Sequence, residues 1–342
     1  VDRNSPTGPS RGELFTATRT IEDVLEAGAD YTHPLAANLS MQILALQTLG
    51  RVRGETESRQ VGSLQTSTNR ETSGESIARG ALTWRPRAGL SIEVGGEGAF
   101  NFLEGHTAVT LNGARLPLAN GDLRVEERRA EAFVTAAWKP VAKLSVTGET
   151  RAEFSKISST GDTERSRSFV FLKPRLVLAY APTPGSQVRL RVQREIGQLN
   201  FRDFVASADL ATGTFDAGNA DLEPERSWII EGALEQRFWG KGVASVTLTH
   251  QQIKKVVDLL PVGTIDSPGN IGDGTRDVLQ ATLTLPMDRL GIVNGRLTST
   301  TTWIKSKVTD PVTGRSRRFS EEPDWSYSID IRQPLPDLKL LW

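Results

Sequence analysis

The chain has 342 residues, in which 41 Lys and Arg balance 41 Asp and Glu, and it contains no cysteine. The neutral balance argues against binding to nucleic acid through charge, and the lack of cysteine excludes disulfides, zinc–thiolate sites and a thiol nucleophile. No apolar run approaches 18 residues, so the sequence has no helical membrane span.

Short turn segments rich in proline or glycine divide the chain at near-regular intervals. Their central residues are Pro34, Pro86, Pro140, Pro182, Gly240, Pro286 and Pro334. The spacing, roughly 42 to 58 residues, matches one strand, a long loop, a returning strand and a tight turn. Aromatic residues precede several of these turns, as is typical where a strand leaves the hydrocarbon through the headgroup layer. They are Trp84, Trp138, Tyr180, Phe238 and Trp239.

Between the turns, apolar residues occupy every second position. In chain order the apolar sets include Leu90, Ile92 and Val94; Leu144, Val146 and Phe154; Val188, Leu190 and Val192; Trp228, Ile230 and Leu234; Val246 and Leu248; Leu279 and Leu283; and Trp325, Tyr327 and Ile329. The alternating polar residues face the other side of each strand. This pattern predicts one face toward lipid and one toward a wet interior, to which we assign Arg189, Arg191, Glu195, Glu231, Glu235 and Arg237.

Strand length favours a membrane barrel over a soluble sandwich. Strands of soluble proteins run about five or six residues, whereas segments 76–86, 124–138 and 166–180 keep an extended pattern for ten or more, the length that a tilted membrane strand needs. We therefore predict an all-β, antiparallel transmembrane β-barrel, with residues 1–342 as a single domain.

Longer polar segments lie opposite the tight turns. They comprise residues 54–74, 104–123, 156–167, 200–224, 258–275 and 306–323. Short turns on one rim and long loops on the other are typical of outer-membrane barrels, so we place the turns in the periplasm and the loops outside the cell.

The segment Gly218-Asn-Ala-Asp-Leu-Glu-Pro-Glu-Arg-Ser-Trp-Ile-Ile-Glu231 resembles a stretch that opens a barrel strand in TonB-dependent outer-membrane receptors. Ala220 stands where that family usually has proline. Residues 253–257, 270–274 and 303–314 resemble the segments that follow in the same family. The likeness extends over most of the chain and is most specific from about residue 218 to 314.

The resemblance implies energised uptake of an iron chelate such as a siderophore, a vitamin or an oligosaccharide across a bacterial outer membrane. Members of this family are 22-stranded barrels with a plugged lumen, and the expected partners are membrane lipid, the small-molecule substrate and a TonB-type energy-coupling protein that acts through the plug. No plug is recognisable here, and the seven turns correspond to about 14 strands, so we expect a partial barrel.

Loop side chains are the candidates for ligand contact, because specificity resides in loops on a rigid scaffold. They are His106, Arg165, Arg167, Phe201, Arg202 and Asp203. The interior charges either guide substrate and hold the plug or pair with one another across strands.

The chain shows no recognisable chemistry of catalysis. His33, His106 and His250 lack metal-ligand spacing, and neither a nucleophile motif nor a defensible pair of catalytic carboxylates is recognisable. We expect no metal site, no cofactor and no enzyme activity. Two alternatives stay open: a passive porin or structural barrel, and a soluble β-rich carbohydrate enzyme.

Overall fold

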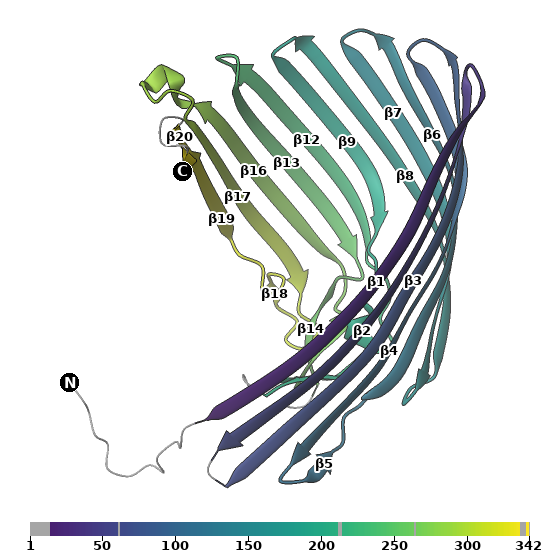
Figure 1. Cartoon of the computed structure of the whole chain (residues 1–342), viewed down its shortest axis with the longest axis vertical. Coiled ribbons are helices and arrows are strands. Elements are labelled where there is room, and N and C mark those ends of the chain that lie inside the picture. The colour runs from purple at the N-terminus through teal and green to yellow at the C-terminus, as the bar shows by residue number, and fades with distance from the viewer. Residues whose placement is uncertain (1–13, 61, 211–213, 263–264, 336–339, 342) are drawn as a thin grey trace.

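The computed structural model describes residues 14–60, 62–210, 214–262, 265–335 and 340–341. Within these residues an antiparallel sheet of fifteen strands curves into a partial barrel, open on one side (Figure 1). Almost every strand pairs with its neighbours along the chain, and the two edges of the sheet do not pair with each other in the described residues. The all-β, antiparallel partial barrel predicted from the sequence is confirmed.

The sheet consists of long strands and two short flaps. The long strands are β1 (Phe15–Ala36), β2 (Leu39–Gln60), β3 (Ser63–Arg87), β4 (Leu90–Leu111), β6 (Asp122–Val141), β7 (Leu144–Gly161), β8 (Arg165–Thr183), β9 (Ser186–Ile196), β12 (Arg226–Phe238), β13 (Gly242–Lys254), β16 (Gly274–Pro286), β17 (Arg296–Thr309) and β19 (Trp325–Arg332). The flaps are β5 (Ala114–Leu116) on β4 and β18 (Ser316–Arg317) on β17.

The remaining elements are short. A small sheet is formed by β10 (Ser207–Asp209), β11 (Thr214–Asp216), β15 (Ile265–Asn270) and β14 (Val257–Val262), and a strand pair by β20 (Pro334–Leu335) and β21 (Leu340–Leu341). Two single 3₁₀ turns are η1 (Phe201–Phe204) and η2 (Met287–Leu290). No helix in the described residues has the length and hydrophobicity needed to cross a membrane.

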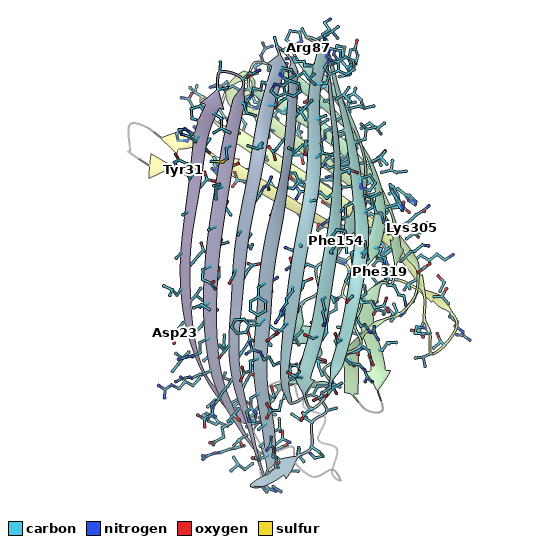
Figure 2. The ribbon with its side chains drawn as sticks, turned by 90° about the vertical axis from the view of Figure 1, so that its right-hand side faces the viewer. Asp23, Tyr31, Arg87, Phe154, Lys305 and Phe319 are labelled. Atoms are coloured by element: carbon cyan, nitrogen blue, oxygen red, sulfur yellow. The ribbon has the colours of Figure 1, made fainter. Side chains whose placement is uncertain are left out.

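The cross-strand register keeps each set of alternate residues on one face. Leu190 lies opposite Gly232, and Arg191 opposite Glu231. Large apolar side chains such as Leu190 and Phe154 are exposed on the convex face, which Figure 2 shows. The intervening polar side chains line the concave face. The period-two pattern of the sequence is therefore the physical origin of the two different surfaces.

The prolines of the short-turn rim lie in the strands, just before the turns. Pro86 and Pro140 are within β3 and β6, and the register of each hairpin shifts between Trp84 and Arg87 or between Trp138 and Val141. Proline has no N–H for the ladder and is tolerated at such bulges. Similar shifts occur near Pro34 and Pro182. These four turns thus lie two to four residues beyond the prolines from which they were predicted.

Three polar segments that we expected to be loops are largely strand. Strands β2 and β3 stay paired as far as Gln60 and Ser63, so most of segment 54–74 is strand. In segment 104–123, β4 runs to Leu111 and β6 begins at Asp122, and segment 156–167 holds only a short connection between β7 and β8. Polar composition misled the prediction, because a strand that extends beyond the apolar belt can be polar on both faces.

The true long loops fold back over the concave face. In Figure 1 they lie within the curve of the sheet at its lower end. Apolar side chains of the wall and the β9–β12 loop form a shared core, comprising Leu103, Leu123, Val125, Ile157, Phe204, Val205, Ala220 and Leu222. A second core joins Ile253, Val256, Ile271 and Val308 under Leu260 and Phe319. These cores fix the loops that surround the candidate site.

Candidate functional site at the loop end of the barrel

The loop between β9 and β12 is fastened to the inner wall by polar contacts as well as by its core. Arg202 in η1 makes a bidentate pair with Glu71 of β3, with Nε to Oε2 and Nη2 to Oε1 distances of 2.9 Å each. Asn120 donates from Nδ2 to the Gly218 carbonyl oxygen at 2.6 Å, and its own carbonyl oxygen accepts from the Ala206 N–H. A bidentate guanidinium–carboxylate pair fixes orientation as well as distance. The loop is thus held across strands far away in the sequence.

The segment that carries the family resemblance performs a structural task in this region. Asn219 donates from Nδ2 to the Pro268 carbonyl oxygen at 2.8 Å, and the Asn270 side chain accepts from the N–H of Glu223 and donates to its carbonyl oxygen. Glu225 accepts from the Val257 N–H at 2.6 Å. These bonds join the start of β12 to the β14–β15 hairpin. The motif therefore ties two loops together before the strand begins.

Five of the six predicted ligand contacts are connected to the β9–β12 loop. Arg165 and Arg167 bind Asp221, at 3.2 and 3.0 Å, and Arg167 also reaches Glu223. Phe201 packs on the apolar core, and Arg202 pairs with Glu71 as above. Asp203 accepts from the Asn200 side chain, and burial raises the pKa of its carboxyl. Their contacts here are anchoring ones, and direct contact with a ligand stays a prediction.

The sixth residue, His106, lies apart from that loop. It occupies the convex face of β4, beside Asp122 of β6, with its Nδ1 3.3 Å from the Asp122 carboxylate. Alternation along β4 could have revealed this, because His106 has the same parity as Val94 and Phe100.

We call the Arg202–Glu71 pair the first latch. A second latch, around Asp258 in β14, holds the segment that follows β17. The Asp258 carboxylate accepts from Arg317 Nη1 at 2.7 Å and from the Ser320 N–H at 3.0 Å. Burial favours the neutral acid, but the hydrogen bonds from Ser320, Leu259 and Arg317 outweigh it and hold the pKa of Asp258 below its ordinary value. Phe319 covers the second apolar core beside this pair.

Beside Asp258 and Ser320 lies a pocket of about 560 Å³ on the concave face of β9, β12, β13 and β16. Its floor includes Ser227, Ile229 and Gln251. Arg276 is the single basic residue that lines it. Five acidic residues line it, namely Glu195, Glu225, Asp258, Glu321 and Glu322. Arg276 binds Glu322 at 2.6 Å. The pocket therefore offers excess carboxylate oxygens and amide or hydroxyl groups to a molecule in the interior.

Burial shapes the protonation of one of these carboxyls. Burial raises the pKa of Glu225, although the Val257 N–H opposes the shift by bonding to the carboxylate. Within the described residues, no cluster of three or more potential metal ligands occurs. The carboxyl, amide and hydroxyl groups of the pocket can bind a molecule by hydrogen bonds and charge.

Further along the concave face, the predicted interior charges pair with neighbouring side chains, either across strands or along one strand. Glu231 accepts from Arg191 and, at 3.1 Å, from Arg189. Glu235 pairs with Arg237 at 3.0 Å, and Glu195 accepts from Gln193. All of these side chains lie on the concave face. This pairing is what a structural role would require, and the role of these residues stays a prediction.

A larger network on β6, β7 and β8 was not singled out from the sequence. The buried Glu131 lies 2.8 Å from Lys173, which also binds Glu153 at 2.7 Å. Nearby, the Phe133 ring lies between the guanidinium groups of Arg79 and Arg151, at 4.6 and 4.9 Å from the ring centroid. Charged residues at alternate positions of these strands were the signal in the sequence that could have revealed this network. Which charges meet depends on the register, which places Glu131 opposite Glu153 and Arg151 opposite Lys173.

Comparison with known proteins identifies the group to which this architecture belongs. The sequence profile described as "TonB dependent receptor-like, beta-barrel" matches residues 2–340. The comparison with curated protein sequences returned no match.

Among solved structures, similar folds include the ferric citrate transporter FecA (TM-score 0.67, 11% identity, 93% of this chain and 47% of that one). The ferric yersiniabactin uptake receptor FyuA from Yersinia pestis gives a TM-score of 0.66 at 12% identity, covering 92% of this chain and 47% of that one. The ferric-catecholate import receptor Fiu from E. coli K12 gives 0.65 at 10% identity, covering 96% and 53%. The chain therefore spans about half the length of these receptors.

The match along nearly the whole sequence and the shared barrel architecture lead to one conclusion. This chain belongs to the family of TonB-dependent receptors, which are transporters and receptors, and its structure corresponds to part of their β-barrel.

Proposed function

We propose that this protein takes up a small iron chelate across a bacterial outer membrane, driven by a TonB-type energy-coupling protein. The receptors that share its fold are described as handling ferric citrate, ferric catecholates and ferric yersiniabactin. In this proposal the barrel surrounds a plug domain, through which the coupling protein acts.

The observation that carries the proposal is the acidic pocket on the concave face. Its volume, about 560 Å³, is within the range of small-molecule sites. It opens to the interior of the barrel, and its walls are loops that two separate latches hold in place. Such a site can capture a solute from the loop side and present it to the interior.

The charge of the pocket narrows the class of chelate. Five carboxyl groups and one guanidinium line it, so an anionic chelate would be repelled and a neutral or cationic one favoured. Glu195 and Glu225 are the groups that we expect to accept hydrogen bonds from the ligand, because Asp258 and Glu322 already pair with arginines.

The test is uptake of radiolabelled iron by bacteria that depend on this protein, using chelates of different charge. We expect uptake of a neutral or cationic chelate that stops when the energy-coupling protein is removed. Replacing Glu195 and Glu225 with Gln should reduce it by roughly tenfold. The control Glu235→Gln alters a concave carboxylate outside the pocket and should retain uptake. Uptake that persists without the coupling protein, or that favours anionic chelates, would contradict the proposal.

The proposed orientation places the loops outside the cell and the short turns in the periplasm. Cysteine at Arg115, in flap β5, should react with an impermeant label on intact cells, and cysteine at Ala142, in the β6–β7 turn, only after the outer membrane is opened. Both side chains are exposed. Reversed labelling would refute the orientation but not the transport proposal.

A passive channel is the second candidate, favoured by the inward-folded loop between β9 and β12. Such a loop narrows the interior, as expected of a porin. Single-channel recording separates the two functions, since a porin would conduct steadily with the wild-type protein and a plugged receptor would not.

A further inference from the structure

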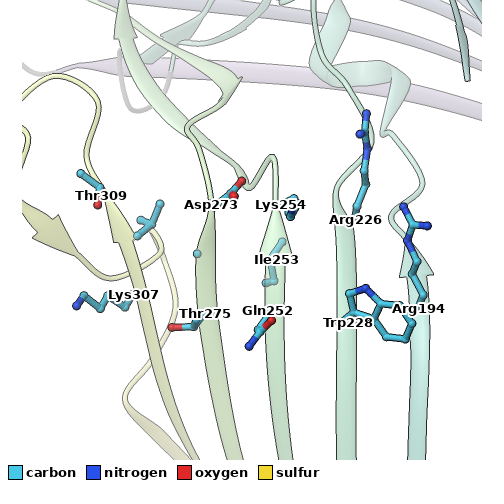
Figure 3. A pocket seen from close by; sticks show the side chains of 12 residues that line it. Arg194, Arg226, Trp228, Gln252, Ile253, Lys254, Asp273, Thr275, Lys307 and Thr309 are labelled. Carbon is cyan, nitrogen blue, oxygen red and sulfur yellow. The ribbon is translucent and has the colours of Figure 1, made fainter. Parts of the chain in front are cut away.

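Two adjoining hollows occupy the convex face near the loop end, away from the acidic pocket. The first, of about 670 Å³, crosses β9, β12, β13, β16 and β17 and is seen in Figure 3. Trp228 and Gln252 line it at one level, together with Thr275 and Lys307, their neighbours across the strands. Gly274 and Asp273 line it on the side of the loops.

The second hollow, of about 920 Å³, continues along the same strands toward the short-turn end. Leu248, Leu279 and Trp303 are direct cross-strand neighbours in its wall. Gly232 completes that row, and nothing lies within 4 Å of the place where its side chain would be. This row forms an apolar trough open to the surroundings of the barrel, and the polar lining of the hollow consists mainly of His250, Asp277, Lys305, Arg318 and Asp324.

Polar side chains line the second hollow on the side that faces the first. The next row holds His250, Asp277 and Lys305, in which His250 and Asp277 bind each other at 2.6 Å. Successive rows on one face are about 7 Å apart, because each residue advances about 3.4 Å. The convex face thus changes from apolar to polar within one or two rows, as happens where a strand passes from hydrocarbon to headgroups.

The first hollow has an excess of positively charged side chains. Arg194, Arg226, Lys254 and Lys307 line it, and Asp273 is its single carboxylate. Arg226 binds Glu223, whereas Arg194, Lys254 and Lys307 form no ion pair with any residue that the structure describes. The same strands are acidic on the concave side, as Glu195 beside Arg194 shows. The two faces therefore attract ligands of opposite charge.

We propose that these hollows bind one phosphorylated, acylated lipid of the leaflet at the loop end. Its phosphate is held by Arg194, Lys254 and Lys307, which can donate charge-assisted hydrogen bonds. An acyl chain occupies the trough over Gly232, Leu248 and Leu279, beside Trp303. Trp228, two rows nearer the loop end, lies at the headgroup level. Basic clusters beside apolar surface are the arrangement by which membrane proteins recognise anionic lipids. The proposal rests on the membrane placement in the proposed function, but not on the identity of the chelate.

The test measures binding of lipid A, which carries phosphate and acyl chains, to the whole protein purified in a neutral detergent, by native mass spectrometry. Three samples are compared: the wild type, the triple variant Arg194→Gln, Lys254→Gln, Lys307→Gln, and the control Arg51→Gln, Arg53→Gln, Lys156→Gln. The control residues are exposed cations of the same convex face on β2 and β7. We expect one tightly bound lipid in the wild type and control, and a loss of affinity of about tenfold or more in the triple variant.

Two further measurements locate the acyl chain and the phosphate. Gly232→Leu fills the trough without changing charge and should also weaken binding, whereas inorganic phosphate should not displace the lipid. Equal losses in the triple variant and the control would reduce the effect to general surface charge and overturn the site. Displacement by inorganic phosphate, or unchanged binding in Gly232→Leu, would overturn the acyl trough. Unchanged chelate uptake and membrane insertion in all variants would separate this result from failure of the proposed function.

Discussion

At the scale of single residues, Gly218 illustrates how a motif residue can be fixed by packing. A Cβ on Gly218 would overlap the Phe204 carbonyl oxygen and come within 2.6 Å of two backbone carbons. Gly218→Ala should therefore push the loop from η1 and destabilise its closed form by about 1–3 kcal/mol. Hydrogen exchange of residues 199–210 measures this. The control Gly232→Ala meets no atom within 4 Å and should leave exchange unchanged; equal protection in both variants would refute the packing argument.

Asp258 makes the second residue-scale prediction, which concerns pH. Its folded-state pKa lies below the ordinary value, so its pairing stabilises the β14–β15 hairpin above the unfolded-state pKa, about 3.9. That stability is lost as the pH falls through the lower, folded-state value. Proteolysis of residues 310–323 should therefore accelerate only below about pH 4. Asp258→Asn should already be susceptible at neutral pH and show a smaller further change; an unchanged acid profile in this variant would refute the assignment.

At the scale of elements, the pair between Arg202 and Glu71 decides whether the β9–β12 loop stays on the wall. The Glu71 side chain is only 9% exposed, so Arg202→Ala leaves a mostly buried carboxylate without its partner. We expect the closed loop to lose about 1–3 kcal/mol. Spin labels on Ser207 and on the wall would report the opening as a longer, broader distance distribution.

The exchanged pair Arg202→Glu with Glu71→Arg separates the contact from the individual residues. It should recover part of the closed population, because the ion pair is restored in reverse. A double variant that is as open as the sum of the two single variants would show that the pair itself contributes nothing.

At the scale of the whole molecule, the two faces of the sheet predict opposite tolerance to charge. Leu190 is 43% exposed on the convex face, and Leu190→Arg should cost about 2–4 kcal/mol if it lies near the bilayer midplane. Arg191→Leu should cost less, since Glu231 keeps Arg189 at 3.1 Å. Urea unfolding in lipid vesicles measures both. A larger cost at Arg191 would mean that the faces are reversed.

The sequence by itself determined the barrel and the division of its strands into two faces. Both follow from a period of two residues, a local property that survives in the order of side chains such as Leu190 and Arg191. The turn rim was predicted to within a few residues, because proline and glycine act on their own neighbours. The charged residues of β9 and β12 were assigned to the interior from the same alternation along each strand.

Only the tertiary structure decided where the loops go and what their side chains bind. Arg202 and Glu71 are 131 residues apart, and no local pattern could pair them. Residues 54–74 were mistaken for a loop, since polarity on both faces resembles loop composition until the partner strand is known. The acidic pocket arises in the same way, from strands and loops that the curvature of the sheet brings together. Local rules fix which face a side chain occupies, whereas register and inward loop packing fix its neighbours.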